Sequence, residues 1–158
     1  MVREGRVNDA VFGASVPRLE DERLLRGEAR FVDDIALPGM LEAAFVRSAH
    51  AHAHIREIDK STALAIPGVH AVLTLDDLQP HLETDRLVVG LPSPSYRQDR
   101  NRIALAGAET VHVGEPIALV VADDRYIAED AAALVDVYYD PLPAVADARA
   151  ALAEDAAP

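Results

Sequence analysis

Three of the chain's six histidines stand at alternate positions in the stretch RSAHAHAHI, residues 47–55. Imidazole nitrogens are common zinc ligands, so this spacing raises the question of a metal site. In an extended strand, a period of two places His50, His52 and His54 on one face. Cα atoms two residues apart in a strand are separated by about 6.6 Å, so one His-x-His pair can share a zinc ion, but the outer pair lies about 13 Å apart.

One regular strand therefore cannot bring all three histidines to one ion, and a helix would bring together only His50 and His54. Further ligands would have to come from elsewhere in the chain, and the sequence identifies none. The alternative is a partly buried strand whose imidazoles hydrogen-bond to the backbone or to a neighbouring domain. We favour this second interpretation and assign no metal ligand.

Three pairs of consecutive aspartates could do acid–base chemistry, because two neighbouring carboxylates can separate their pKa values. They are Asp33/Asp34, Asp76/Asp77 and Asp123/Asp124. Each pair stands at an expected turn or helix start, which favours capping and turn roles. Glu115, directly before an apolar run, is the carboxylate to inspect first. A structural role at the entry to a strand is favoured over a catalytic role for Glu115 as well.

Several common chemistries lack the residues that they need. Without cysteine, the chain can form no disulfide, hold no thiolate-ligated iron–sulfur cluster and use no cysteine nucleophile. The sequence also has no Gly-x-Gly fingerprint, no phosphate-binding loop and no Gly-x-Ser-x-Gly elbow. Local chemistry therefore assigns no catalytic and no cofactor-binding residue.

Charge and hydropathy exclude further classes of function. The net charge is −12, from 27 acidic and 15 basic side chains, and Lys60 is the only lysine, which excludes nucleic acid as an expected partner. Four arginines, Arg86, Arg97, Arg100 and Arg102, form a mildly basic stretch that we expect to be solvated surface. The sequence opens without the apolar core of a signal peptide, and its longest apolar run, residues 117–122, is too short for a membrane span. A cytoplasmic location is the expectation.

The elements that must position these residues are short. A strand is expected to begin in LEAAFVRS, residues 41–48, and to continue through the histidines to Ile55 or Ile58, with a break near Ala49 left open. Further strands are expected at 69–75, 103–105, 110–113, 116–122 and 135–140, and helices at 19–26, at 59–66, at 76–77 as a single turn and after Asp124. Residues 81–102 have the composition of a long loop, and residues 145–155 that of a terminal helix or linker.

Three separated stretches together resemble a known family. They are residues 13–55, beginning GASVPRLEDERLL, residues 66–78, IPGVHAVLTLDDL, and residues 111–145, VHVGEPIALVVADDRYIAEDAAALVDVYYDPLPAV. In content and order they resemble the N-terminal α/β-hammerhead domain of the molybdenum hydroxylase large subunit. That family contains xanthine dehydrogenases, aldehyde oxidases and aerobic carbon monoxide dehydrogenases. Its members typically read RSPHAHARI at the histidine stretch, so Ala49 replaces a proline here and His54 an arginine, which further weakens the metal interpretation.

The resemblance implies an α+β fold, a single α/β-hammerhead domain of mixed strands with a few short helices. It places this domain at residues 13–150, after a mobile lead-in at 1–12 and before a C-terminal linker or tail at 151–158. Family members are oxidoreductases that use a molybdopterin-type molybdenum cofactor, [2Fe–2S] clusters and usually FAD. The pterin loops and the catalytic glutamate lie in a larger domain that normally follows, so we expect no cofactor in this chain and no activity from it alone.

The resemblance also implies partners. They are the molybdenum-binding catalytic domain, the iron–sulfur subunit and an FAD subunit where one is present. We expect this chain to be a structural and subunit-contacting section of such an enzyme. Isolated, it is expected to expose an apolar patch and to self-associate or capture another chain. The alternative function is a stand-alone binding or assembly module without catalysis.

Overall fold

The computed structural model describes residues 12–13, 15–87, 93–94, 101–153 and 156. The chain divides into two units, Met1–Gly39 and Met40–Pro158, which are described separately. In the first unit, helix α1 covers Asp21–Leu25 and the 3-10 turn η1 covers Val32–Asp34. Its described residues include no buried side chain, so local contacts hold these turns. The backbone N–H of Phe31, for example, donates to Asp34 Oδ2 at 2.9 Å, the turn role expected of that aspartate.

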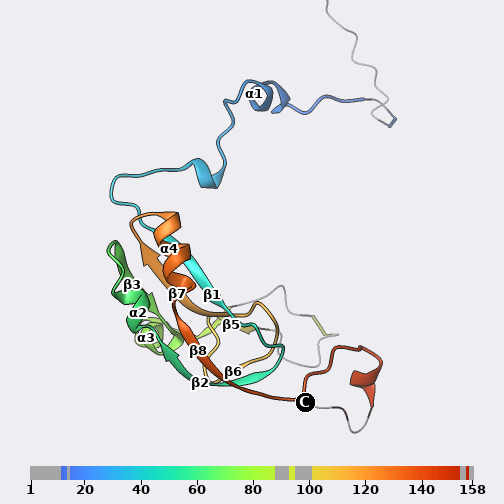
Figure 1. Cartoon of the computed structure of the whole chain (residues 1–158). Helices are drawn as coiled ribbons and strands as arrows, with labels where there is room; N and C mark the ends of the chain where they lie inside the picture. The colour runs from blue at the N-terminus through green and yellow to red at the C-terminus, as the bar shows by residue number, and fades with distance from the viewer. Residues whose placement is uncertain (1–11, 14, 88–92, 95–100, 154–155, 157–158) are drawn as a thin grey trace, which may run out of the picture. The chain divides into compact units, whose positions relative to one another are not determined.

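Two three-stranded antiparallel sheets build the second unit (Figure 1). The first has the order β1-β7-β3, made of Glu42–Arg47, Pro116–Ala122 and Val69–Leu73. The second has the order β6-β2-β8, made of Glu109–Thr110, Ala53–Asp59 and Asp136–Pro141. A smaller pair joins β4, Arg86–Leu87, to β5, Arg102–Ile103. Every pairing in the two larger sheets is antiparallel.

The core lies on one face of the first sheet, around the central strand β7. The apolar run PIALVVA forms this strand as predicted, and β1 and β3 flank it on both edges. Helix α4, Arg125–Ala132, packs against β1 and β7, while α2, Ser61–Leu64, packs against β3 and α4. The buried cluster comprises Val46, Ala63, Val72, Ala118, Val120, Ala131 and Val135. Small side chains dominate it, which lets the short helices lie close to the sheet.

The aspartate pairs start helices, as the sequence predicted. Asp124 Oδ1 accepts a hydrogen bond from the N–H of Ile127 at 2.9 Å and so caps α4. Asp77 lies in α3, Leu75–Leu78, and its Oδ2 accepts hydrogen bonds from the amide and the hydroxyl of Thr74, each at 2.8 Å. The ammonium of Lys60, followed by these two donors, lowers the pKa of Asp77 to about 2. Asp124 and Asp77 therefore have the capping role expected of them, and Asp77 is also ion-paired with Lys60.

The remaining described segments are short. The 3-10 turns η2 and η3 cover Gln79–His81 and Ala150–Leu152. Much of the long loop predicted at 81–102, including Arg97 and Arg100, lies outside the described residues. Among the residues that are described, no helix has both the length and the apolar character needed to cross a bilayer.

Gly68 is the glycine whose replacement should be felt most strongly. Its φ is +91°, and a Cβ at this position would lie 2.9 Å from Ile127 Cδ1 and 3.1 Å from Asp123 Oδ2. Gly114 has a similar φ of +84° but open space where its Cβ would be. We expect Gly68→Ala to lower the free energy of unfolding by about 2 kcal/mol and Gly114→Ala by about 1 kcal/mol. Urea unfolding of both variants measures the difference, and equal losses would show that crowding at Gly68 is relieved without cost.

Candidate functional site

The expected histidine strand is broken, and the residues at the break belong to a cluster of polar contacts. Strand β1 ends at Arg47 and β2 begins at Ala53, and the two strands lie in different sheets. Between them, the N–H of His50 donates to Ser48 Oγ at 3.0 Å, and this hydroxyl donates to the carbonyl of His50 at 2.8 Å. Such local hydrogen bonding by serine competes with a strand ladder and turns the chain. The alternative of a break near Ala49 is therefore confirmed, and the prediction of one continuous strand through the histidines is wrong.

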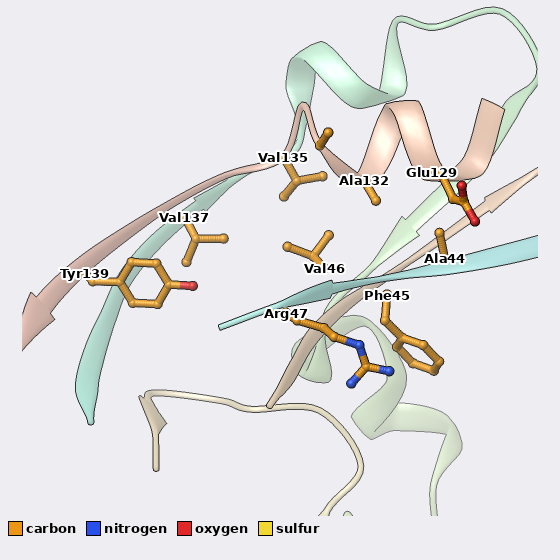
Figure 2. A pocket seen from close by; sticks show the side chains of 10 residues that line it. Ala44, Phe45, Val46, Arg47, Glu129, Ala132, Val135, Val137 and Tyr139 are labelled. Atoms are coloured by element: carbon orange, nitrogen blue, oxygen red, sulfur yellow. The ribbon is translucent and has the colours of Figure 1, made fainter. Parts of the chain in front are cut away.

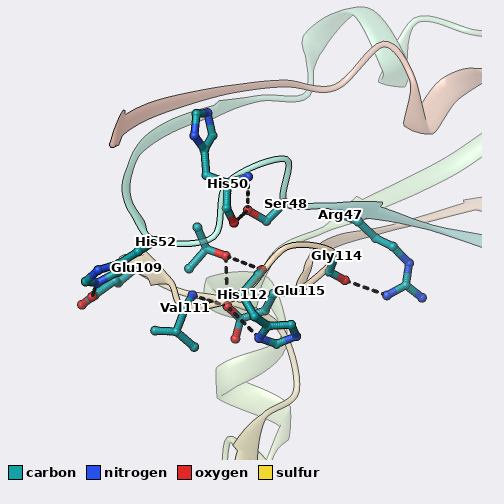
Figure 3. Close-up of polar contacts among 10 residues, drawn as sticks. Arg47, Ser48, His50, His52, Glu109, Val111, His112, Gly114 and Glu115 are labelled. Carbon is teal, nitrogen blue, oxygen red and sulfur yellow. Dashed lines mark hydrogen bonds and ion pairs between the residues drawn. The ribbon is translucent and has the colours of Figure 1, made fainter. Parts of the chain in front are cut away.

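The turn faces a second segment, and together they form what we call the loop cluster (Figure 3). The cluster consists of Arg47, Ser48, His50, His52, Glu109, Thr110, Val111, His112, Gly114 and Glu115. Backbone hydrogen bonds join its two segments: Ser48 N–H donates to the Glu115 carbonyl at 2.9 Å, and Gly114 N–H donates to the Ser48 carbonyl at 2.8 Å. The guanidinium of Arg47 adds a bond of 2.9 Å to the Gly114 carbonyl.

The three histidines of the opening motif have three different surroundings. The His50 ring lies 4.6 Å, centroid to centroid, from the ring of Tyr139 in β8. His54 is exposed on β2. The His52 side chain is only 13% exposed and lies between the carboxylate of Glu109 and the carbonyl of Pro143, with Nδ1 2.8 Å from that carbonyl oxygen. The structure thus does not gather them around one point.

Both partners of His52 are hydrogen-bond acceptors, so they favour the protonated form of its ring. The Pro143 carbonyl, followed by the Glu109 carboxylate, raises the pKa of His52 above its ordinary value of 6.5. The sequence did not identify Glu109 or Pro143 as partners, because they lie 57 and 91 residues away in the chain. No local sequence pattern indicates a contact between residues so far apart in the chain.

Glu115 is the buried carboxylate of the loop cluster, with a side chain 8% exposed. Its Oε2 accepts the hydroxyl of Thr110 at 3.0 Å and the N–H of Val111 at 2.6 Å. His112 Nδ1 stands 3.8 Å away. Because Glu115 takes the amide of Val111, β6 ends at Thr110 and does not run to Val113 as predicted. The structural role favoured for Glu115 agrees with these contacts.

A separate groove of about 440 Å³ lies between β1, α4 and β8 (Figure 2). Its lining is Ala44, Phe45, Val46, Arg47, Glu129, Ala132, Ala133, Val135, Val137 and Tyr139. Phe45 is 46% exposed and carries the Arg47 guanidinium over its ring, 5.3 Å from the centroid. Burial is the main influence on Tyr139 and raises the pKa of its phenol. The groove has the chemistry of a packing surface more than of a reaction site.

Most polar groups of the loop cluster and of the groove already have a hydrogen-bond or ion-pair partner within the chain. Across the described residues, no group of three or more His, Cys, Asp or Glu side chains is arranged to hold a metal ion. Buried side-chain nitrogens and oxygens in the described part of the chain all have partners. The geometry therefore supports a structural role, which depends on shape, hydrogen bonds and exposed apolar side chains.

Residues 26–143 match the family model described as the a/b hammerhead domain of aldehyde oxidase and xanthine dehydrogenase. The chain belongs to this hammerhead family. The predicted family and the predicted α+β hammerhead fold are both confirmed. The loop cluster and the groove are thus features of a hammerhead domain.

Curated relatives place this hammerhead domain among molybdenum hydroxylase large subunits. It is 44% identical over 145 residues to the carbon monoxide dehydrogenase large chain of Afipia carboxidovorans, a match that covers 92% of this chain and 17% of that protein. It is 37% identical over 132 residues to the xanthine dehydrogenase molybdenum-binding subunit of Escherichia coli O157:H7, covering 84% of this chain and 17% of the relative. The hammerhead domain thus spans about one sixth of the length of these relatives.

Solved structures agree with this assignment. The domain superposes on the Cu,Mo-CO dehydrogenase with a TM-score of 0.77 at 43% identity, covering 92% of this chain and 17% of that one. The aldehyde oxidoreductase from Desulfovibrio gigas gives a TM-score of 0.81 at 34% identity, covering 90% and 16%. Both likenesses span nearly the whole hammerhead domain.

Proposed function

We propose that this hammerhead domain is the structural and subunit-contacting N-terminal section of an oxidoreductase large subunit of the molybdenum hydroxylase class. One observation carries the proposal: 92% of the chain matches the carbon monoxide dehydrogenase large chain at 44% identity, yet it accounts for 17% of that protein. Catalysis would then belong to polypeptide beyond the hammerhead domain. The substrate of the complete enzyme is left unassigned.

The donor chemistry of the chain supports this division of labour. The sequence has no cysteine to ligate an iron–sulfur cluster, and the described His, Asp and Glu side chains form no group that could hold a metal. The described residues therefore offer no ligand set for a [2Fe–2S] cluster. We propose that the molybdopterin-type cofactor, the [2Fe–2S] clusters and FAD all lie in other parts of the enzyme, and that the enzyme is cytoplasmic.

Exposed apolar side chains support the contacting role. In the second unit, they include Phe45, Val111, Val113, Leu134 and Tyr138, each at least two-fifths exposed. We propose that some of them meet the molybdenum-binding domain and the iron–sulfur subunit, and an FAD subunit where the enzyme has one. The proposed boundaries of the domain are residues 13 and 150, with a lead-in before it and a linker or tail after it.

A chimera tests the proposal. This chain would replace the matching segment of the Afipia carboxidovorans carbon monoxide dehydrogenase large chain, with which it shares 44% identity. We expect the chimeric large chain to co-purify with the same partner chains as the parental enzyme and to retain molybdenum in a similar ratio, measured by size-exclusion chromatography and metal analysis. The matched control is the same chimera carrying Val120→Asp, whose hammerhead core should not form.

A chimera that fails to assemble, although the isolated 158-residue chain unfolds cooperatively, would contradict the proposal. That result would favour the stand-alone binding or assembly module. Retained assembly in the Val120→Asp control would also count against it, because the subunit contacts would then not need a folded hammerhead domain.

A further inference from the structure

The chain leaves β8 through a segment that His52 holds in place. We call residues 142–152 the exit segment. The N–H of Leu142 donates to the carbonyl of His52 at 2.9 Å, and the His52 ring nitrogen Nδ1 lies 2.8 Å from the carbonyl oxygen of Pro143. The same residue thus contacts the exit segment through both its backbone and its ring. The other ring nitrogen, Nε2, meets the carboxylate of Glu109 on β6.

The exit segment also covers a hollow of about 570 Å³ beside this contact. Ala144, Val145 and Ala151 line it from the exit segment, facing His52, Val111 and Val113. The side chains that the exit segment contributes are small, and Val145 remains 40% exposed. Apolar packing alone is therefore a modest restraint on the segment, so the hydrogen bonds of His52 carry a large share of it.

The protonation state of the ring decides how many of these bonds exist. A carbonyl oxygen and a carboxylate can only accept, so each ring nitrogen must carry a hydrogen to bond both. Only the imidazolium has two N–H groups. Either neutral tautomer keeps one bond and turns a nitrogen lone pair toward an oxygen at the other.

We propose that His52 is a pH-sensitive clasp, which as an imidazolium fastens the exit segment to the β6-β2-β8 sheet and as a neutral ring releases it. The clasp does not depend on the proposed enzyme, because all its parts lie in this chain. It would regulate how firmly residues 142–152 are held against the β6-β2-β8 sheet.

The sign of the pH dependence follows from the raised pKa of His52. Its stabilising contribution is complete below 6.5, the ordinary value, and is lost as the pH rises through the higher pKa of the folded state. Among the described residues, the other titratable groups that line the hollow are Glu109 and His112. On the neighbouring strands, His54 is the Cα partner of both Glu109 and Asp140, and Asp140 is ion-paired with Arg56. Glu109 is itself part of the clasp, so the pH experiment must be controlled for His112 and His54.

Hydrogen exchange of the 158-residue chain, followed by NMR, tests the clasp. After correction for intrinsic exchange, the protection of the Leu142 amide should fall about tenfold between about pH 5.5 and about pH 8.5, with a midpoint equal to that of the His52 ring signals. In His52→Gln, protection should be low and independent of pH. His54→Gln, the matched control two residues along, should behave as the parent does.

A second variant keeps the test decisive if His52→Gln does not fold. Glu109→Gln keeps an acceptor but removes the negative charge, so the midpoint for Leu142 and the titration of His52 should both move to lower pH. The proposal is overturned if Leu142 protection is unaffected by pH in the parent. It is likewise overturned if its midpoint follows His112 or His54 instead, or if the dependence survives in His52→Gln.

Discussion

Replacing Val120 with aspartate is expected to abolish the cooperative unfolding transition of the second unit. Val120 is 0% exposed on the central strand β7, within the cluster that includes Val72 and Ala131. No polar partner for a carboxyl group is present in this apolar cluster, so burying one should cost at least about 4 kcal/mol. Domains of this size have a total stability of roughly 5–15 kcal/mol, so little would remain. Circular dichroism during urea titration measures the loss.

Val113→Asp is the matched control, because the same chemical change is made at a side chain 64% exposed. We expect its free energy of unfolding to stay within about 0.5 kcal/mol of the parent value. If Val120→Asp unfolded with the parental midpoint, the burial of β7 and the position of the core would both be contradicted.

Glu115→Ala should lower the free energy of unfolding by about 3 kcal/mol. The carboxylate accepts two hydrogen bonds, from the Thr110 hydroxyl and the Val111 amide. Its removal leaves both donors without this acceptor at a site that is poorly exposed to solvent. The loop cluster should loosen with it, because the Glu115 backbone also joins this segment to Ser48. Urea unfolding gives the size of the loss, and exchange of the Val111 amide should locate it.

Two milder variants separate the contribution of one hydrogen bond from that of the negative charge of Glu115. Thr110→Val keeps the shape of the side chain and removes one donor, for an expected loss of about 1 kcal/mol. Glu115→Gln keeps one acceptor oxygen and should fall between this variant and Glu115→Ala. A Glu115→Ala protein as stable as the parent would mean that water replaces the carboxylate without cost.

Local patterns predicted the parts of the fold that depend on nearby residues. The run PIALVVA predicted β7 because a short continuous apolar run is typical of a strand covered on both faces. In the structure, one face of β7 is buried, and Leu119 and Val121 on the other face are half-buried. Asp124 predicted the start of α4 because a carboxylate reaches the free amide three residues on. Both interactions are encoded within a few residues, so the sequence displays them directly.

The candidate site was less predictable, because distant pairings decide it. The alternation of His50, His52 and His54 reads as one strand, yet Ser48 turns the chain and sends β2 into another sheet. The clasp partners of His52 come from β6 and from beyond β8, with no spacing rule to connect them. The resemblance to the hammerhead family gave the fold but not these contacts.

The two larger sheets also have a consequence for how the polypeptide is made. Among the described residues, strands β1 and β3 pair with β7, and β2 pairs with β6 and β8, and each of these partner strands begins at or after Glu109. This is a topology of high contact order, for which folding times of milliseconds to seconds are typical. A ribosome that has released only the first half of the domain therefore presents β1, β2 and β3 without their sheet partners. We expect the nascent chain to stay unfolded until β8 emerges, and during that interval its apolar strand edges are open to aggregation and to chaperones.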